Sequence, residues 1–480
     1  MVEDLSARLS AIVGADHVLS DGAIEEYSHD ATFVESPPLA VVLPATTDEV
    51  AAVARVCSET GTPLTTRGQG SGLVGGPVPL SGGVVLSTER FTSIEIFDRD
   101  LMATAGAGAI TGDIDAAAAE HGLMYPPDPG SVSMCSIGGN VACNSGGMHC
   151  LKYGVTADYV TGLTVVLVDG TVLRLGGRLR KRSSGYRLLS LFVGSEGTLG
   201  IVTEVTVKLI PRPRQHATAM VSFDSIEDAS EAVGRLLTSG HFPAALELLN
   251  QSALHHVGDL LPAGLSSEHA AVLIVEQDGS DAESVLMELA QMVEVLGGTG
   301  DWVAQTDAER EGLWKARRTF GQVLRRERKN VFGEDVAVPL SQIPEMVRRF
   351  DTMAREHGVQ MPAVAHVGDG NLHPNFLFEE SQRPLVAPLA AQILRDSIEL
   401  GGTISAEHGL GCLKRDFAIL EHGDVAIGWW RKLKDLFDPK GILNPHKLFP
   451  EQPADDRFLD AQPGWGKTLA SGLDRTESGV

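Results

Sequence analysis

Two histidines on either side of a turn signal are the residues of this chain with the clearest capacity for chemistry. They lie in the segment 363–377, AVAHVGDGNLHPNFL, where the pair Asp369-Gly370 stands between two runs of alternating residues. An Asp-Gly pair in this setting predicts a two-residue β-hairpin turn. Such a turn would place His366 directly opposite His373 with their Cβ atoms about 5 Å apart, close enough for both rings to bind one metal ion.

Side-chain alternation along the two strands predicts a polar face and an apolar face for this hairpin. It adds Asn375 to the face of the two histidines and sends Ala365, Val367, Leu372 and Phe376 to the other face. The histidines and the amide are thus expected to share one surface.

A carboxylate and a third imidazole follow in SAEHGLG, residues 405–411. Glu407 and His408 are adjacent there, with glycines that leave room around them. Two histidines and one glutamate form a common three-ligand set for zinc or a similar divalent ion, with one position open for substrate. A single histidine is more often structural, so the prediction depends on the pairing of His366 with His373 and on the neighbouring Glu-His dipeptide.

The chain as a whole has the composition of a large globular protein. Its 480 residues are enough for two or three domains, and 43% of them are hydrophobic. The formal charge of -24 disfavours nucleic acid or an anionic membrane surface as a partner. No apolar run approaches the roughly 18 residues of a transmembrane helix, and the start MVEDLSARLS is too polar for a secretory signal. We therefore expect a cytoplasmic protein with no integral membrane segment.

A glycine-rich loop, RGQGSGLVGG at 67–76, follows the strand, helix and strand with which the chain opens. Five of its ten residues are glycine, which lets successive backbone N–H groups converge on an anion, and Arg67 and Ser71 add a charge and a hydroxyl. No Gly-Lys-Ser/Thr opens a helix here, so this is not a Walker loop. Apolar runs on both sides argue against a flexible linker, and we interpret the segment as an anion-binding loop.

Two further segments carry the small residues and amides expected around a bound ligand. Residues 126–154 are dense in Pro, Gly, Ser and Asn and form a long irregular stretch, which inside a compact domain is usually functional. Its small side chains suit close backbone approach to a flat polar ligand. Residues 191–211 then place a glycine-rich turn with Glu196 before a continuous strand.

The pattern of secondary structure changes near residue 214. Amphipathic helices at 226–237 and 282–296 alternate with a strand at 271–276, which predicts an α+β domain with an antiparallel sheet. Both stretches that carry candidate metal ligands lie in this second part. The polar residues 451–480 are predicted to be a disordered tail.

These motifs together resemble a known family. RGQGSGLVGG, the segment 129–140 and FVGSEGTLGIVTE are similar to the flavin domain of the vanillyl-alcohol oxidase / p-cresol methylhydroxylase (PCMH) superfamily. HVGDGNLHPN, SAEHGLG and DPKGILNPHKLFP resemble its D-2-hydroxy-acid dehydrogenase branch. That branch includes cytochrome-type D-lactate dehydrogenase, the flavin subunit of glycolate oxidase and D-2-hydroxyglutarate dehydrogenase. The resemblance spans roughly residues 37–450.

The resemblance implies an α+β protein with two domains. Residues 1–36 would form an N-terminal helical segment, 37–213 a PCMH-type FAD-binding domain of two subdomains, 214–450 the substrate- and metal-binding domain, and 451–480 the tail. FAD would be bound noncovalently, since Ser71 stands where covalently linked members carry histidine.

The same resemblance implies which residues contact FAD. They are Pro44, Arg67, Gly68, Gly70, Ser71, Gly72, Gly75, Pro129, Gly130, Ser131, Gly138, Gly139, Asn140, Ala142, Asn144, Ser145, Glu196, Gly197, Gly200, Ile201, Val202 and Asn444.

In the second domain, the resemblance implies a role for each polar motif residue. The ligands of a divalent metal, Zn or Mn/Fe, would be His366, His373 and Glu407. His408 matches the catalytic base, Arg317 in LWKAR matches the arginine that binds the substrate carboxylate, and Asn375 is a further substrate contact.

The implied reaction is oxidation of a small D-2-hydroxy acid, D-lactate-like or glycolate, to the 2-oxo acid. The electrons would pass from the flavin to a cytochrome, an electron-transfer flavoprotein, a quinone or oxygen. A homodimer is a further expectation.

Three other functions stay open at this stage. D-2-hydroxyglutarate is a second candidate substrate, although Gly333-Glu334-Asp335 lacks the lysine that such enzymes carry there. A metal-dependent hydrolase would use the same histidines and be colourless. A non-redox transferase, as in the ether-lipid synthase branch, would keep the FAD. In addition, Arg182 and Arg187 replace the family's usual Lys-Asn and Tyr-Asp, with no consequence that the sequence explains.

Overall fold

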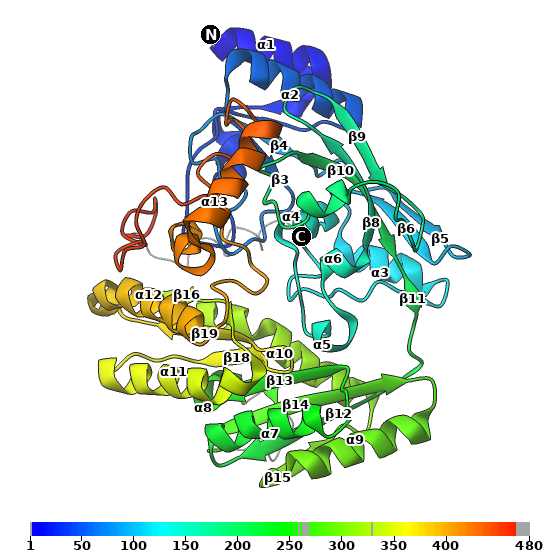
Figure 1. The fold of residues 1–480 in the computed structure, drawn as a ribbon, viewed down its shortest axis with the longest axis vertical. Helices are drawn as coiled ribbons and strands as arrows, with labels where there is room; N and C mark the ends of the chain where they lie inside the picture. The colour runs from blue at the N-terminus through cyan, green and yellow to red at the C-terminus, as the bar shows by residue number, and fades with distance from the viewer. Residues whose placement is uncertain (1, 258–259, 262–267, 328–329, 467–480) are drawn as a thin grey trace.

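Two lobes stacked along the long axis make up the molecule (Figure 1). The structure is a computed structural model and describes residues 2–257, 260–261, 268–327 and 330–466. The first lobe holds the N-terminal part of the chain and also the late helix α13 (Ala418–Phe437), whereas the second runs from β12 (Gln215–Phe223) to α12 (Arg383–Glu399). No helix within the described ranges is long and apolar enough to cross a membrane.

A four-stranded, mostly parallel sheet opens the first lobe. Its order is β1 (Val18–Leu19), β2 (Ala40–Val42), β4 (Val84–Ser87) and β3 (Leu64–Arg67), with β1 antiparallel to β2. Helices α1 (Val2–Val13) and α2 (Thr47–Thr60) pack together on it through buried leucines and valines. Helix α2 begins where Thr46 Oγ1 accepts the Glu49 N–H at 3.2 Å, and it ends at Gly61, which has a φ of 67°.

A five-stranded antiparallel sheet completes the first lobe. Its order is β5 (Ile94–Phe97), β6 (Met102–Gly106), β10 (Ile201–Lys208), β8 (Val160–Val166) and β9 (Val172–Gly176). The helices of this part are α3 (Thr111–Ala119), α4 (Ile137–Cys143), α5 (Cys150–Tyr153) and α6 (Thr156–Tyr159). A pair of short strands, β7 (Leu123–Met124) and β11 (Ile210–Pro211), lies where the chain passes to the second lobe (Figure 1).

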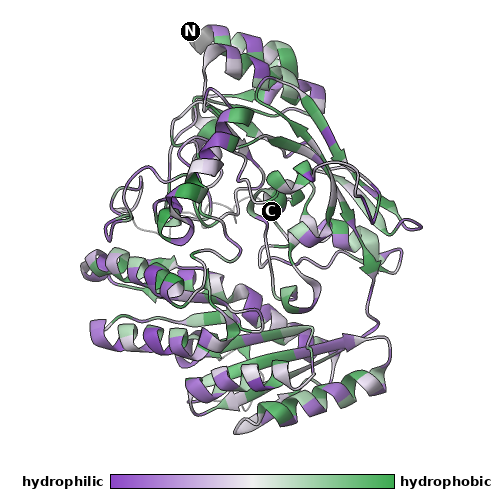
Figure 2. Cartoon of the chain, viewed as in Figure 1, coloured by the Kyte–Doolittle hydropathy of each residue, from purple (hydrophilic) through white to green (hydrophobic). Residues whose placement is uncertain are grey.

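The second lobe is built on one large antiparallel sheet, as predicted. Its order is β15 (Gly300–Val303), β12, β14 (Ala271–Gly279), β13 (Ala245–Asn250), β18 (Ala363–His366), β19 (Asn371–Leu377) and β16 (Val331–Gly333), and β17 (Val336–Ala337) also pairs with β19. One face is covered by α7 (Ile226–Thr238), α9 (Ala282–Leu296), α11 (Ile343–His357) and α12, and the other by α8 (Gln251–Val257) and α10 (Asp307–Glu327). Figure 2 shows hydrophilic and hydrophobic positions alternating along the outer helices, as expected where one side of a helix is buried.

The sheet face beneath α8 and α10 meets the first lobe. Met148 of the first lobe packs in the same apolar cluster as Leu249 of β13 and Trp314 of α10. Because side chains alternate along a strand, Glu247 of β13 projects to this same face as Leu249. The candidate functional side chains of β13, β18 and β19 described below lie on this face.

The predicted hairpin is present, but its turn is longer than predicted. Residues 367–370 separate β18 from β19, so that His366 lies opposite Asn371 and not opposite His373. A shift of two residues keeps every side chain on its predicted face, since the side-chain period of a strand is two. Accordingly, the residues predicted for the apolar face lie in the main core of the lobe: Ala365, Val367, Leu372 and Phe376.

Residues 451–466 do not form a disordered tail, contrary to the prediction. Trp465 is only 4% exposed, and its ring centroid lies 4.9 Å from that of Phe33 and 5.8 Å from that of Phe332. Arg383 of α12 donates a hydrogen bond to the backbone oxygen of Trp465. These contacts attach the end of the described chain to the N-terminal segment and to the second lobe. Residues 467–480 lie outside the described ranges.

Candidate active site

The two histidines of the hairpin meet the carboxylate of Glu407. Glu407 Oε1 lies 3.5 Å from His366 Nε2 and 3.3 Å from His373 Nε2, and the two imidazole centroids are 5.1 Å apart. One ligand atom of each residue lies within 4.8 Å of the others. Two imidazole nitrogens and a carboxylate oxygen at this spacing suit zinc or a similar divalent cation. The fold thus brings together the three residues predicted as metal ligands.

Glu247, which the sequence analysis missed, supports this cluster from behind. Its Oε1 lies 2.6 Å from His366 Nδ1, and its Oε2 accepts a hydrogen bond of 2.7 Å from Arg317 Nε. A carboxylate on Nδ1 fixes the ring and leaves Nε2 for a metal. Burial lowers the pKa of His366, but Glu247 and Glu407 outweigh this effect and raise that pKa well above its usual value. The available signal was a charged residue inside the apolar run ALELLN.

Asp335 is a second carboxylate that the sequence analysis did not assign to the site. It is fully buried, and its Oδ2 accepts hydrogen bonds of 2.8–3.1 Å from the Ser405 hydroxyl and the backbone N–H groups of residues 406–408. Burial raises the pKa of Asp335, but its electrostatic interactions with His408 and Lys414 help to lower it to about 2. The ionised carboxylate therefore holds the segment that carries Glu407 and His408 in one conformation.

His408 lies beside the metal-ligand cluster. Its ring centroid is 5.3 Å from that of His373 with 22° between the planes, and its Nε2 is 3.7 Å from Glu407 Oε1. Burial lowers the pKa of His408, against the raising effects of Asp335 and Glu407. A lowered pKa keeps this imidazole neutral near neutral pH, which is the form that accepts a proton. Asp335, His373 and His408 also form a second group with the spacing of metal ligands.

Arg317 of α10 is buried with one nitrogen unused. Its Nε is bonded to Glu247, whereas Nη2 is buried and has no hydrogen-bond partner among the residues that the structure describes. A buried guanidinium with an unused N–H is suited to bind a carboxylate. Asn375, the other predicted substrate contact, uses its Nδ2 to donate to the backbone oxygen of His373 at 3.0 Å. Arg317 therefore has the greater free capacity for a ligand.

The glycine-rich loop begins at the carboxyl end of β3, the edge of a parallel sheet at which ligands commonly bind. Pro44 follows β2 at the same edge. Gly75 has a φ of +75°, and a Cβ there would lie 2.5 Å from Cys412 Sγ, so this position requires glycine. The loop therefore packs directly on the segment that follows His408. It carries the predicted Gly68, Gly70, Ser71, Gly72 and Gly75.

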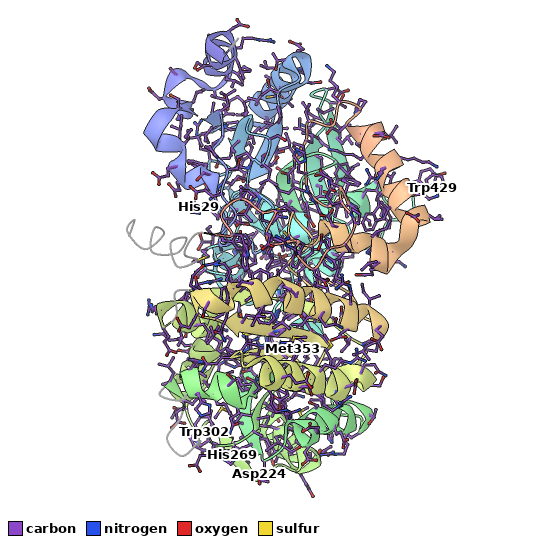
Figure 3. All side chains as sticks on the ribbon, turned by 90° about the vertical axis from the view of Figure 1, so that its left-hand side faces the viewer. His29, Asp224, His269, Trp302, Met353 and Trp429 are labelled. Atoms are coloured by element: carbon purple, nitrogen blue, oxygen red, sulfur yellow. The ribbon has the colours of Figure 1, made fainter. Side chains whose placement is uncertain are left out.

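The side chain of Arg67 differs from its predicted role. Its guanidinium donates to the backbone oxygens of His29, at 2.5 Å, and Glu26, at 3.1 Å, instead of facing an anion in the loop. His29 is labelled on the first lobe in Figure 3. Asp30 supports the loop from the same N-terminal segment, because its Oδ2 accepts the Gly75 N–H at 2.8 Å. Both side chains therefore shape the loop, and the predicted anion binding would fall to its backbone N–H groups.

The other predicted FAD residues lie around α4 and before β10. The first group surrounds α4: before it lie Pro129, Gly130 and Ser131, within it Gly138, Gly139, Asn140 and Ala142, and after it Asn144 and Ser145. The second group lies at the start of β10: before the strand are Glu196, Gly197 and Gly200, and its first two residues are Ile201 and Val202. The Glu196 N–H donates to the Ala142 oxygen at 2.9 Å, which joins the two segments. Within this group, Asn140 Nδ2 donates to Thr111 Oγ1 at 2.8 Å and the Ile201 side chain is fully buried in an apolar cluster. The contact of these two residues with FAD stays a prediction.

Glu196 connects these segments with the metal-ligand segment. Its carboxylate oxygens accept the N–H groups of Leu410 at 2.7 Å and Gly411 at 2.8 Å. Burial raises the pKa of Glu196, and these two backbone hydrogen bonds oppose that shift. Gly146 approaches the same segment, since a Cβ there would lie 2.8 Å from Glu407 Oε2. The first lobe therefore reaches the candidate metal site through two separate loops.

Unused polar atoms beside these loops fit a bound polar cofactor. Thr66 Oγ1, Ser136 Oγ and Asn444 Oδ1 are buried and have no hydrogen-bond partner in the described part of the chain. A Cβ on Gly197 would lie 4.0 Å from Thr66 Cβ and 3.9 Å from Asn444 Nδ2, so two of these residues flank the turn that follows Glu196. Buried polar groups normally have partners, so the unused atoms suit a ligand with many hydroxyl and amide groups, as FAD has.

A second contact between the lobes is ionic and was also missed. His149 Nδ1 lies 2.7 Å from Asp128 Oδ2, and its Nε2 lies 3.2 Å from Glu276 Oε1 of β14. Glu276 also accepts the Trp314 Nε1–H at 2.5 Å. Burial lowers the pKa of His149, but Asp128 and Glu276 outweigh this effect and raise that pKa well above its usual value. Burial raises the pKa of Glu276, but the hydrogen bonds that this carboxylate accepts, first the one with His149, bring its pKa well below the usual value.

Comparison with known proteins identifies both lobes. The family model of an FAD binding domain matches residues 38–176, and that of FAD linked oxidases, C-terminal domain, matches residues 212–448. The glycolate oxidase subunit GlcD of Bacillus subtilis is 41% identical over 88% of this chain and 92% of its own length. The chain belongs to the FAD-linked oxidases. GlcD of Escherichia coli is another relative of this FAD-linked oxidase, 36% identical over 93% of this chain and 91% of its own length. A D-lactate dehydrogenase of Archaeoglobus fulgidus is 36% identical over 87% of this chain and 94% of its own length.

Solved structures agree with this FAD-linked oxidase in fold. p-Cresol methylhydroxylase with substrate bound superposes with a TM-score of 0.77 at 17% identity, covering 93% of this chain and 96% of its own. Alkyldihydroxyacetonephosphate synthase gives a TM-score of 0.74 at 18% identity, covering 93% and 86%. The predicted PCMH-type FAD-binding fold followed by an antiparallel α+β domain is confirmed. The protein is an FAD-dependent oxidoreductase, and a flavin-free hydrolase has no support.

Proposed function

We propose that this FAD-linked oxidase converts a small D-2-hydroxy acid, D-lactate-like or glycolate, to the 2-oxo acid with noncovalently bound FAD. The observation that carries the proposal is the unused Nη2 of buried Arg317. The Nε atom of this arginine bonds the Glu247 carboxylate, which also contacts His366. A small acid whose carboxylate binds Arg317 would therefore lie next to the histidine cluster. The names of the relatives, glycolate oxidase subunit and D-lactate dehydrogenase, support the same class of substrate.

Three residues would act directly on such a substrate or beside it. Arg317 would bind the carboxylate with its free N–H groups and so orient the molecule. His408, whose pKa is lowered by burial, would accept the proton of the 2-hydroxyl on a ring nitrogen. Glu247 would keep Arg317 in position. FAD, when bound, supplies the acceptor for the hydride from C2.

His366, His373 and Glu407 would hold a divalent cation, Zn or Mn/Fe. Burial raises the pKa of Glu407, but the hydrogen bonds with the two histidines outweigh it, and the pKa lies well below its usual value. Glu407 is therefore ionised, as a ligand must be. A cation bound there would supply Lewis acidity that lowers the pKa of the substrate hydroxyl.

The environment of Lys414 favours a monocarboxylate over D-2-hydroxyglutarate. A second, distal carboxylate would need a free cation near Glu334 and Asp335, which connect β16 to β17. Lys414 is the basic side chain there, but it is 4% exposed and its Nζ already donates to the backbone oxygens of Asp335, at 2.6 Å, and Ile404, at 2.9 Å. It also pairs with Glu334 at 3.0 Å.

The proposal is tested by replacing the base. In His408→Asn, FAD content should stay at the wild-type level, while the rate of flavin reduction by D-lactate or glycolate falls by about 10²–10⁴-fold, because an amide does not accept the hydroxyl proton. Anaerobic stopped-flow absorbance at the flavin band measures this rate. His357→Asn, at the exposed end of α11, is the matched control and should react as the wild type does.

Two outcomes would point elsewhere. Rapid bleaching of the His408→Asn flavin would remove that residue from the reaction. Wild-type flavin that no D- or L-2-hydroxy acid reduces would favour the non-redox transferase. Metal removal gives a separate test: full activity after exhaustive chelation would rule out a catalytic cation.

A further inference from the structure

Residues 178–188, RLRKRSSGYRL, form an exposed loop between β9 and the short helix η3 (Leu188–Leu191), which we call the basic loop. Five of its eleven residues are basic, none is acidic, and all are exposed to solvent. The chain as a whole carries a formal charge of -24. Cations concentrated in this way repel one another, and an opposite charge brought to the loop would reduce that repulsion.

Two of the arginines attach the loop to the lobe. Arg178 stacks on the ring of Phe97 at 3.8 Å and pairs with Asp100 at 3.3 Å, at the end of β5. Arg182 donates to the Gly176 oxygen at 3.2 Å and to the Ser184 hydroxyl at 3.4 Å. Asp100 is thus the carboxylate with which the loop pairs within its own lobe. The loop is held in place by contacts that leave most of its charge uncompensated.

The remaining cations face solvent. Arg180, Lys181 and Arg187 form no ion pair with any carboxylate that the structure describes. Tyr186, next to Arg187, is 95% exposed, and Leu179 is 60% exposed. An aromatic and an aliphatic side chain left in water between unpaired cations indicate a surface that another molecule covers.

The composition of the loop favours a protein over a lipid surface. Arginine and tyrosine are enriched in protein interfaces and lysine is depleted, and this loop has four arginines, one tyrosine and one lysine. An anionic lipid surface attracts lysine and arginine alike. Such a surface extends far beyond the loop, so it would also meet the acidic remainder of this chain, which has a net charge of -24. A compact acidic patch on a protein would meet the loop while the rest of the two surfaces stay apart.

We propose that the basic loop docks the acidic face of a protein that accepts electrons from this enzyme. The inference rests on the proposed function, because an oxidation of the hydroxy acid releases two electrons and two protons for each turnover. Two copies of a one-electron carrier would each take one electron, and the protons would pass to solvent. The loop leads through η3 into the turn of Glu196, which contacts the catalytic segment, so a carrier docked there would sit on the flavin-binding lobe.

The test uses the FAD-loaded protein and two forms of one carrier, cytochrome c and succinylated cytochrome c, whose lysines have become carboxylates. The triple variant Arg180→Glu, Lys181→Glu, Arg187→Glu leaves the anchoring Arg178 and Arg182 in place. The control variant, Arg55→Glu, Arg355→Glu, Lys432→Glu, makes the same change in net charge at exposed positions on α2, α11 and α13. Thermophoresis at low salt measures the Kd of each pair.

We expect the wild type to bind the succinylated carrier in spite of its own negative charge. The loop variant should raise that Kd by about tenfold or more, the control variant by less than about twofold, and roughly 0.2 M salt should weaken only the wild-type and control complexes. Binding of native cytochrome c alone would overturn the proposal, since bulk charge then decides. Binding of the wild type to phosphatidylcholine/phosphatidylglycerol vesicles without binding of the succinylated carrier would replace the protein partner by a membrane.

Turnover separates this inference from the proposed function. With D-lactate or glycolate, both triple variants should reduce menadione, a neutral acceptor, at the wild-type rate, whereas only the loop variant should lose reduction of the succinylated carrier. If the wild type reduces neither acceptor with any hydroxy acid, the proposed function fails, and the binding measurement still decides the role of the loop. Equal reduction of the succinylated carrier by both variants would refute the docking site.

Discussion

Glu247 holds two candidate functional side chains at once, although it would touch neither substrate nor flavin. It is fully buried, with one oxygen on His366 and the other on Arg317. A buried carboxylate is costly unless both oxygens are bonded, and here each has a cationic or polar partner. At the scale of single residues, the distance between the candidate metal ligand His366 and the candidate carboxylate-binding Arg317 is therefore fixed by one side chain.

We predict that Glu247→Gln weakens both functions together. Gln has one acceptor oxygen where Glu has two, so either His366 or Arg317 would face an NH2 group, and metal affinity should fall by about 10–100-fold while the KM for the hydroxy acid rises. Metal content per flavin and steady-state kinetics measure the two effects. Glu288→Gln is the control, because Glu288 makes a similar 2.7 Å contact with His241 at the surface. A variant that loses only stability would contradict a positioning role.

Helix α10 is the element that couples the active site to the contact between the lobes. Trp314 and Arg317 are three residues apart on it and therefore lie on one side of the helix. Trp314 donates to Glu276 and Arg317 to Glu247, which stand on the neighbouring strands β14 and β13. Since Glu276 also binds His149 of the first lobe, a change in that ionic contact acts on the helix that carries Arg317.

The pH dependence of this contact follows from its pKa shifts. The raised pKa of His149 adds stability that is complete below about pH 6.5 and is lost as the pH rises through the folded-state pKa. The lowered pKa of Glu276 adds stability that is present above about pH 4.3 and is lost as the pH falls through its folded-state pKa. The contact should therefore be strongest between these two values.

We predict that His149→Gln lowers the Tm most near pH 6 and least near pH 9. Removing one partner from a buried ion pair costs about 3–5 kcal/mol, and the deficit should shrink as wild-type His149 loses its proton. Differential scanning calorimetry across this range measures it. His241→Gln, which breaks the surface pair with Glu288, should change the Tm little at either pH. A deficit that does not vary with pH would mean that His149 is not charged in the folded protein.

At the scale of the whole molecule, segments from both ends of the chain close the structure. Helix α13 returns to the first lobe, where the Phe437 ring lies 5.5 Å from that of Phe192 and Lys434 donates to the Thr198 oxygen at 2.8 Å. Residues 451–466 then pass to the second lobe, where Trp465 packs between Phe33 and Phe332. The relative position of the lobes thus depends on late segments as well as on the passage near residue 212.

We predict that Trp465→Ala destabilises the protein by about 3–5 kcal/mol, the usual cost of removing a large buried aromatic side chain. Trp429→Ala is the matched control, because Trp429 projects outward from α13 and is 60% exposed (Figure 3). The midpoint of urea unfolding of Trp429→Ala should be close to that of the wild type. Equal midpoints for the two variants would show that the end of the described chain does not contribute to stability.

The sequence by itself determined the elements whose information is local. The helix predicted at 282–296 has these bounds, and that at 226–237 ends one residue later, because apolar periodicity and caps are written in neighbouring residues. The faces of the hairpin were also predictable, since alternation alone assigns them. The residues of the candidate metal site and the glycine-rich loop could be named from their motifs.

Only the tertiary structure decided how these elements meet. The hairpin turn has four residues because its backbone bonds to other strands: the Gly368 N–H donates to Leu246 and the Gly370 oxygen accepts from Val338. Glu247 lies 119 positions before His366, and no local pattern records that the two touch. Arg67 turns to backbone oxygens of the N-terminal segment, and Trp465 finds an aromatic cluster, for the same reason: which partner a side chain meets depends on residues far away in the chain.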